Sequence, residues 1–259
     1  AVLDFIIKTP TSGGSFMGNF TPSLNRGWGQ YWTSVKVNTG KSEFSYSGWF
    51  APRWNLEMGR SNTERYELAD GSRYVRTEQS QKGSGFEAWH NGHTLNYNFL
   101  DPQKQMFNAS LNLNNNNYKN KYKGILTDER LGGIENNMYD RTEYISLHPS
   151  LNLYYQNNLK KDQLIMANLV TSYETSHSHR LYNENDLATD APMVNIDNLI
   201  KGKTFSVLGE VDYEKTWKNS RFTAGIRHTQ SWIQNKYVEQ NTIDRMNQGN
   251  SYIFGEYWL

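Results

Sequence analysis

The chain has 259 residues, with 27 Lys and Arg against 26 Asp and Glu, so its net charge of +1 provides no field that would attract DNA or RNA. Cysteine is absent, which excludes disulfides, thiol catalysis and Cys-ligated zinc. No window approaches the roughly 18 consecutive apolar residues of a membrane-spanning helix, and this excludes the helical membrane proteins.

The aromatic content is high for a chain so poor in aliphatic residues. Hydrophobic residues make up 36% of the sequence, yet 14% of all residues are aromatic. A disordered chain lacks aromatics, so the chain is expected to fold. Two classes share this composition. One is a soluble carbohydrate-binding β protein, and the other is an outer-membrane β-barrel with a polar interior and girdles of aromatic residues.

Alternation of apolar and polar residues with period two predicts strands along the whole chain. The clearest alternation joins Phe205, Val207, Val211 and Trp217 on one face. No convincing amphipathic helix is present. In chain order, ten strands are predicted at 15–23, 28–38, 42–57, 83–99, 105–118, 143–157, 163–178, 203–217, 221–238 and 249–258.

The connections between these strands differ in length. Tight turns are predicted near residues 40, 102, 160 and 218. Long polar stretches are predicted as loops at 58–82, 117–143 and 179–203, with a further loop near 239–249. Asp70-Gly71 predicts a hairpin turn inside the first of them.

Long loops at one end and short turns at the other are required of a transmembrane barrel, whereas a soluble sandwich has no reason for this asymmetry. The sequence therefore favours an all-β fold, an antiparallel up-and-down transmembrane β-barrel. This chain would hold about ten strands of a larger barrel, and it would form an open curved sheet if isolated.

In such a barrel the alternation assigns each strand residue to lipid or to the water-filled interior. The polar residues expected to face the lumen, where they would contact a plug or a passing ligand, are Asn108, Ser110, Asn112, Ser150, Asn152, Glu210, Asp212, Glu214 and Arg227. The apolar residues expected to face lipid are Leu151, Leu153, Phe205, Val207, Val211, Ala224 and Ile226. The loop residues that could grip a ligand are Arg60, Arg65, Tyr66, Arg73, Tyr74 and Arg76.

Two groups of residues are candidates for a metal site or a catalytic site. His177 and His179 would point to one side of a strand, but two histidines without a third ligand are a weak zinc signal. The acidic row of Glu210, Asp212 and Glu214 would suit a glycoside hydrolase. A water-filled lumen needs polar walls in any case, with charges paired across strands. We therefore expect no enzyme activity, no metal site and no cofactor.

The N-terminal residues carry a family resemblance. The run Ala1-Val2-Leu3-Asp4-Phe5-Ile6-Ile7-Lys8 resembles the Val/Ile-rich segment that ends the plug domain of TonB-dependent outer-membrane receptors. Gly13-Gly14 with the alternating segment after it resembles the entry into their barrel. The rest resembles the barrel domain of the outer membrane protein beta-barrel family, which is related to nutrient importers of the SusC type.

The resemblance implies that the chain is a fragment of such a receptor. Residues 1–10 would end the plug and link it to the barrel, and 11–259 would form the N-terminal part of a barrel of about 22 strands. The parent would import a large nutrient, such as a glycan, peptide or metal chelate, by loop capture and plug rearrangement. Its site would be the cell outer membrane, and its partners the membrane lipid, its own plug, the TonB energy-transducing complex and a surface lipoprotein. A soluble carbohydrate-binding β-sandwich is the alternative, and a glycoside hydrolase is a third class.

Overall fold

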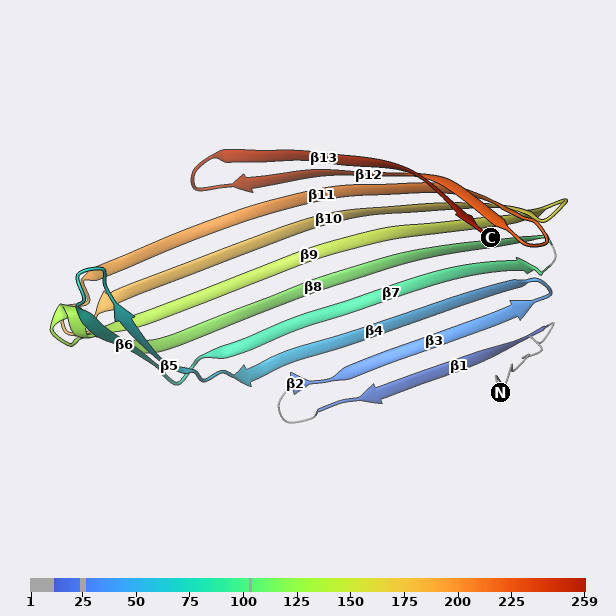
Figure 1. The fold of residues 1–259 in the computed structure, drawn as a ribbon. Coiled ribbons are helices and arrows are strands. Elements are labelled where there is room, and N and C mark those ends of the chain that lie inside the picture. Colours follow the sequence, from blue (N-terminus) through green and yellow to red (C-terminus); the bar gives the residue numbers. More distant parts are fainter. Residues whose placement is uncertain (1–11, 24–26, 103) are drawn as a thin grey trace, which may run out of the picture.

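The computed structural model describes residues 12–23, 27–102 and 104–259, and these form one curved antiparallel sheet (Figure 1). Ten strands follow one another across it in the order β1-β3-β4-β7-β8-β9-β10-β11-β12-β13. Their bounds are β1 Ser12–Thr21, β3 Gln30–Thr39, β4 Ser42–Glu57, β7 Gly85–Asp101, β8 Gln105–Asp128, β9 Ile134–Leu159, β10 Gln163–Asp186, β11 Pro192–Thr216, β12 Arg221–Tyr237 and β13 Thr242–Trp258. The predicted all-β, up-and-down order of ten strands is confirmed.

Three short strands lie off this path. β2 (Gly27–Trp28) pairs with β4, and β5 (Ser61–Glu67) forms a hairpin with β6 (Arg73–Ser80). The hairpin turns at the predicted Asp70-Gly71, where Gly71 has a φ of 82° that favours glycine. The side chain of Asp70 accepts hydrogen bonds from the amide and the hydroxyl of Ser72. The predicted loop at 58–82 is therefore largely a β-hairpin.

The other long polar stretches are strands, and the prediction of loops there is wrong. β8 and β9 remain paired from Gln105↔Asn157 to Asp128↔Ile134, and only residues 129–133 connect them. β10 and β11 likewise remain paired as far as Asn185↔Pro192. The loop predicted near 239–249 is only a short turn, because β12 ends at Tyr237 and β13 begins at Thr242.

The physical reason is that backbone pairing does not require an apolar face. Main-chain hydrogen bonds hold a ladder wherever two strands run together. The period-two signal comes from side chains, and it fades where both faces are polar. Strands of 24 to 26 residues result in β8, β9 and β10, whereas about 9–11 residues suffice to cross a bilayer.

The sheet is a single layer, and its few buried apolar side chains gather at one end. Among the described residues these are Ala88, Tyr122, Leu126 and Met138. β1 and β13 are its two edges, since each pairs with one neighbour within the described ranges. The segment 1–10, predicted to end a plug domain, lies outside the described residues. No helix in the described part of the chain is long and apolar enough to span a membrane.

Candidate functional site

The outer face of the sheet carries a continuous belt of apolar side chains, which we call the apolar belt. The belt is built of rows of apolar residues, in which each residue lies opposite the next one on the neighbouring strand. One such row consists of Val35, Tyr46, Leu95, Leu111 and Leu151. The belt includes every residue that the sequence assigned to lipid. Phe205, Val211 and Ile226 are exposed, and Leu151, Leu153, Val207 and Ala224 are half-buried by their neighbours on the same face.

The height of the apolar belt is set by the residues that bound it. On β11 the outward positions read Lys203, then Phe205 to Tyr213, then Lys215. The eight steps from Phe205 to Tyr213 cover about 27 Å along the strand, or about 21 Å for a strand tilted by roughly 40°. This height is close to the apolar band of about 25 Å that membrane barrels present to lipid.

Polar residues interrupt the apolar belt toward β13, and they bond to one another. The ring of His228 shares a hydrogen bond of 2.8 Å with the hydroxyl of Ser251, its cross-strand partner. Gln230 donates to the carbonyl of Gln248. Pairing of this kind lowers the cost of placing polar groups in an apolar setting. The apolar belt is therefore continuous from β3 to β11 and mixed on β12 and on the edge strand β13.

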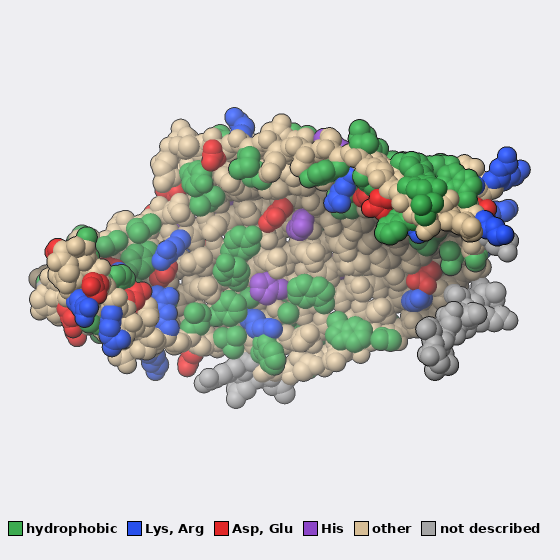
Figure 2. Space-filling model, viewed as in Figure 1, with side chains coloured by type: hydrophobic (Ala, Val, Ile, Leu, Met, Phe, Trp, Pro, Cys, Tyr) green, Lys and Arg blue, Asp and Glu red, His purple; other side chains and the backbone are tan. Residues whose placement is uncertain are grey.

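The inner face is polar, and it is the hollow side of the curved sheet. Figure 2 looks into this hollow, where uncharged polar side chains and backbone dominate, and it shows apolar side chains over the ends of β12 and β13 at the upper right. The register places all the polar strand residues named from the sequence on this one face: Asn108, Ser110 and Asn112 on β8, Ser150 and Asn152 on β9, Glu210, Asp212 and Glu214 on β11, and Arg227 on β12.

Side-chain hydrogen bonds connect the strands across the inner face. Thr94 donates to Asn112 over 2.9 Å, and Asn108 donates to Asn98. Farther along, the hydroxyls of Ser206 and Ser231 lie 2.9 Å apart. The inner face is thus a largely uncharged wall of amides and hydroxyls, which can bind a polar partner through many weak contacts.

Arginines on β12 lie beside two members of the acidic row on β11. Glu214 forms an ion pair of 3.1 Å with Arg221, and Glu210 lies directly opposite Arg227 in the register. Because Glu210, Asp212 and Glu214 alternate along one strand, they share a face without converging on a point. This arrangement is typical of a polar wall in which charges pair across neighbouring strands.

The two histidines of the pair, His177 and His179, have different surroundings. His179 lies 2.8 Å from a carboxylate oxygen of Asp197, while His177 lies opposite Lys201. Among residues 12–23, 27–102 and 104–259, no group of three His, Cys, Asp or Glu side chains could hold a metal ion.

The hairpin β5–β6 folds over the inner face at the end opposite to the tight turns. β6 pairs with β8 from Arg76↔Asp128 to Ser80↔Gly124. Gly124 allows this approach, because a Cβ there would lie 2.9 Å from the carbonyl oxygen of Gln79. Beneath the hairpin are the buried Tyr122, Leu126 and Met138. We call the hairpin and the residues beneath it the hairpin cap.

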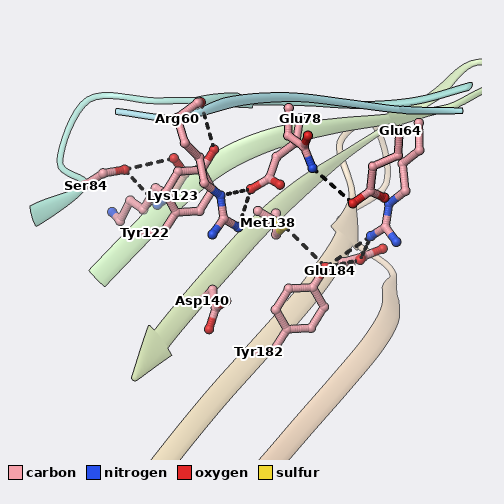
Figure 3. A network of polar contacts seen from close by, with 12 residues as sticks. Arg60, Glu64, Glu78, Ser84, Tyr122, Lys123, Met138, Asp140, Tyr182 and Glu184 are labelled. Carbon is pink, nitrogen blue, oxygen red and sulfur yellow. Dashed lines mark hydrogen bonds and ion pairs between the residues drawn. The ribbon is translucent and has the colours of Figure 1, made fainter. Parts of the chain in front are cut away.

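Two arginines anchor the hairpin cap, and Figure 3 labels one of them, Arg60, together with Glu78, Tyr122 and Glu184. Arg60 donates to Glu78 over 2.6 Å and lies 4.0 Å above the ring of Tyr122. Arg76 reaches across to β10 and forms an ion pair of 2.7 Å with Glu184, which is only 7% exposed. The hydroxyl of Tyr182 also donates to Glu184. Burial, reinforced by this carboxylate, raises the pKa of Tyr182 and keeps the phenol protonated.

The turn between β8 and β9 completes the hairpin cap. Asp128 accepts hydrogen bonds from the amide of Arg130 and from its guanidinium, and this guanidinium lowers the pKa of Asp128. The same guanidinium lies 4.1 Å above the ring of Tyr74. Glu129 accepts a hydrogen bond from the amide of Val75 on the hairpin.

Most of the loop residues named from the sequence are therefore engaged within the protein. Tyr66 and Tyr74 stack at 4.6 Å, and Arg73 pairs with Glu67. Arg65 is exposed, and within the described ranges no acidic group lies within 4 Å of it. Sequence reasoning missed Arg130, Tyr182 and Glu184. No local pattern could find the contact between Arg76 and Glu184, because these residues are 108 positions apart in the chain.

Comparisons with known proteins find similarity among solved structures. No family model matches the sequence, and no curated protein matches it. Among solved structures, the chain is similar to a crystal structure of the ferric citrate transporter FecA in the unliganded form, with a TM-score of 0.47 and 9% sequence identity. The similarity covers 96% of this chain and 40% of that one, so the chain spans well under half of its length. At this level it assigns no ligand and no activity.

Proposed function

We propose that this chain is part of a transmembrane β-barrel in a bacterial outer membrane. The observation that carries the proposal is the apolar belt, which is exposed on one face of a single sheet whose other face is polar. Burying an apolar surface of this extent requires either hydrocarbon or a second protein layer. The described residues form one sheet, so a soluble sandwich lacks the second sheet that it needs.

Within the described residues, β1 and β13 each leave one edge unpaired, and these edges extend the same proposal. In lipid every backbone amide and carbonyl must be paired, so an open sheet cannot stay there. Further antiparallel strands would therefore complete the barrel beside β1 and β13. This fits the inference that the chain is one part of a larger barrel.

We further propose that the parent is a TonB-dependent receptor that imports a large nutrient, such as a glycan, peptide or metal chelate. The support is the resemblance of residues 1–8 and Gly13-Gly14, together with a polar inner face that a plug and a passing ligand would share. In this mechanism the hairpin cap takes part in capture, the plug rearranges, and the TonB complex supplies the energy. A surface lipoprotein would assist capture.

Adjacent residues on β9 provide a matched test of membrane embedding. Leu151 lies on the outer face near the middle of the apolar belt, and Asn152 lies on the inner face at the same level. We expect Leu151→Arg to cost about 2–4 kcal/mol of folding free energy in a bilayer, since arginine would enter hydrocarbon. Asn152→Arg should assemble almost normally, because it faces water. Assembly is measured by protease resistance of the full chain in outer membranes, and equal assembly of both variants would refute the proposal.

The transport proposal needs its own measurement. Deleting the gene should abolish uptake of one nutrient too large for porins, in a panel of glycans, peptides and metal chelates. Collapse of the inner-membrane proton gradient should abolish the same uptake in the wild type. Uptake that survives this collapse would rule out a TonB-driven receptor while leaving the barrel intact.

A further inference from the structure

Four cationic side chains gather on the outer face where the apolar belt ends. They are Lys201 and Lys203 on β11, Lys236 on β12 and Arg245 on β13. Lys201 lies directly opposite Lys236, and Lys203 and Arg245 flank Gln234 in the adjoining row. All four belong to the face that carries Phe205 and Trp232, because side chains alternate along each strand. We call them the cationic cluster.

No acidic group in the described part of the chain neutralises the cationic cluster. Within the described part of the chain, none of its members lies within 4 Å of an acidic group. Asp197 is paired with His179, and Glu239 accepts a hydrogen bond from the amide of Leu199. Like charges directly opposite each other on neighbouring strands destabilise a sheet. An anion placed between Lys201 and Lys236 would remove this repulsion.

An aromatic hollow adjoins the cationic cluster on the side of the apolar belt. Tyr173, Phe205 and Trp232 form a row across β10, β11 and β12, and the rings of Phe205 and Trp232 stack at 5.4 Å. The hollow has a volume of about 360 Å³, and Lys203 and Arg245 line it as well. It therefore presents ring surfaces toward the apolar belt and cations at its rim.

We propose that the cationic cluster and this hollow bind the phosphorylated headgroup of a membrane lipid, with the first part of an acyl chain against the aromatic row. The inference rests on the proposed membrane function. Phosphate suits the cations because guanidinium and ammonium groups form charge-assisted hydrogen bonds with its oxygens. A lipid fits better than a free anion because the hollow beside the cations is apolar, and a soluble anion gains nothing there.

The test compares a doubly phosphorylated glycolipid, lipid A, with its dephosphorylated form. Binding to the detergent-solubilised full chain is measured by native mass spectrometry. Wild type should prefer the phosphorylated lipid strongly. The Lys203→Gln/Arg245→Gln variant should bind it about twenty-five-fold more weakly, at about fivefold for each cation removed. Lys119→Gln is the matched control, because that lysine is already paired with Glu143 at 3.3 Å and should change binding less than about twofold.

Several results would overturn the proposal. Equal wild-type binding of the phosphorylated and dephosphorylated lipids would show that the phosphate is not recognised, and this comparison does not require that any variant folds. Displacement of the lipid by inorganic phosphate at similar concentration would show a site for free anions. If these outcomes occur while the chain still assembles in membranes, the lipid site fails and the barrel proposal stands. Equal assembly of the Leu151→Arg and Asn152→Arg variants would instead refute the barrel proposal, and the lipid site would fall with it.

Discussion

The hairpin cap depends on the ion pair between Arg76 and Glu184, and replacing Glu184 by Gln tests how firmly the hairpin is held. Glu184 accepts hydrogen bonds from Arg76 over 2.7 Å and from Tyr182, and it is only 7% exposed. Glutamine keeps the shape of the side chain and removes its charge.

The size of the effect follows from these contacts. Hydrogen bonds to charged groups contribute about 1.5–3 kcal/mol each, more than neutral ones. The Arg76 side chain is 30% exposed, so water offsets part of the loss. We expect a cost of about 2 kcal/mol in the free energy of opening the hairpin, which is about thirty-fold in its opening equilibrium.

The assay is amide hydrogen exchange in β6, whose residues 76–80 pair with β8. Exchange there should accelerate about thirty-fold in Glu184→Gln, while the ladder between β10 and β11 stays protected. Glu67→Gln is the control on the same hairpin, because its ion pair with Arg73 has both side chains more than half exposed and should contribute little. Equal exchange in the wild type and Glu184→Gln would show that Arg76 does not hold the hairpin.

Two further perturbations probe the turns that support the hairpin cap. Because Arg130 lowers the pKa of Asp128, this carboxylate stabilises the turn above its unfolded pKa of about 3.9, and the stabilisation is lost as pH falls through the lower folded value. Amide exchange of residues 128–132 should accelerate in that acid range, Asp128→Asn should remove the pH dependence, and an unchanged pH profile would contradict this. Gly71→Ala should cost about 1–2 kcal/mol in hairpin stability, because φ at Gly71 is 82°. Gly209→Ala, where a Cβ would meet open space, should leave exchange in β5 and β6 unchanged, and an equal effect of both would contradict the argument from φ.

Local side-chain patterns predict the strands wherever one face is apolar. Phe205, Val207 and Val211 alternate with Glu210 and Asp212, so both the existence and the facing of β11 follow from side-chain chemistry. The tight turn at Asn38-Thr39-Gly40-Lys41 was also predictable, because glycine readily adopts a positive φ in tight turns. In the structure, φ at Gly40 is 58°. Ten strands and the two sets of strand residues followed from these local signals.

Beyond the apolar belt, the length and pairing of the strands could be learned only from the folded structure. There the strands continue through polar residues because backbone pairing extends them, and no side-chain period marks it. The hairpin cap joins Arg60 with Tyr122 and Arg76 with Glu184, residues that are distant in the chain and meet only when β6 pairs with β8. The cationic cluster, too, exists only through the register that sets Lys201 opposite Lys236. Contacts of this kind join residues that are far apart in the chain, and local sequence patterns do not predict which of these residues will meet.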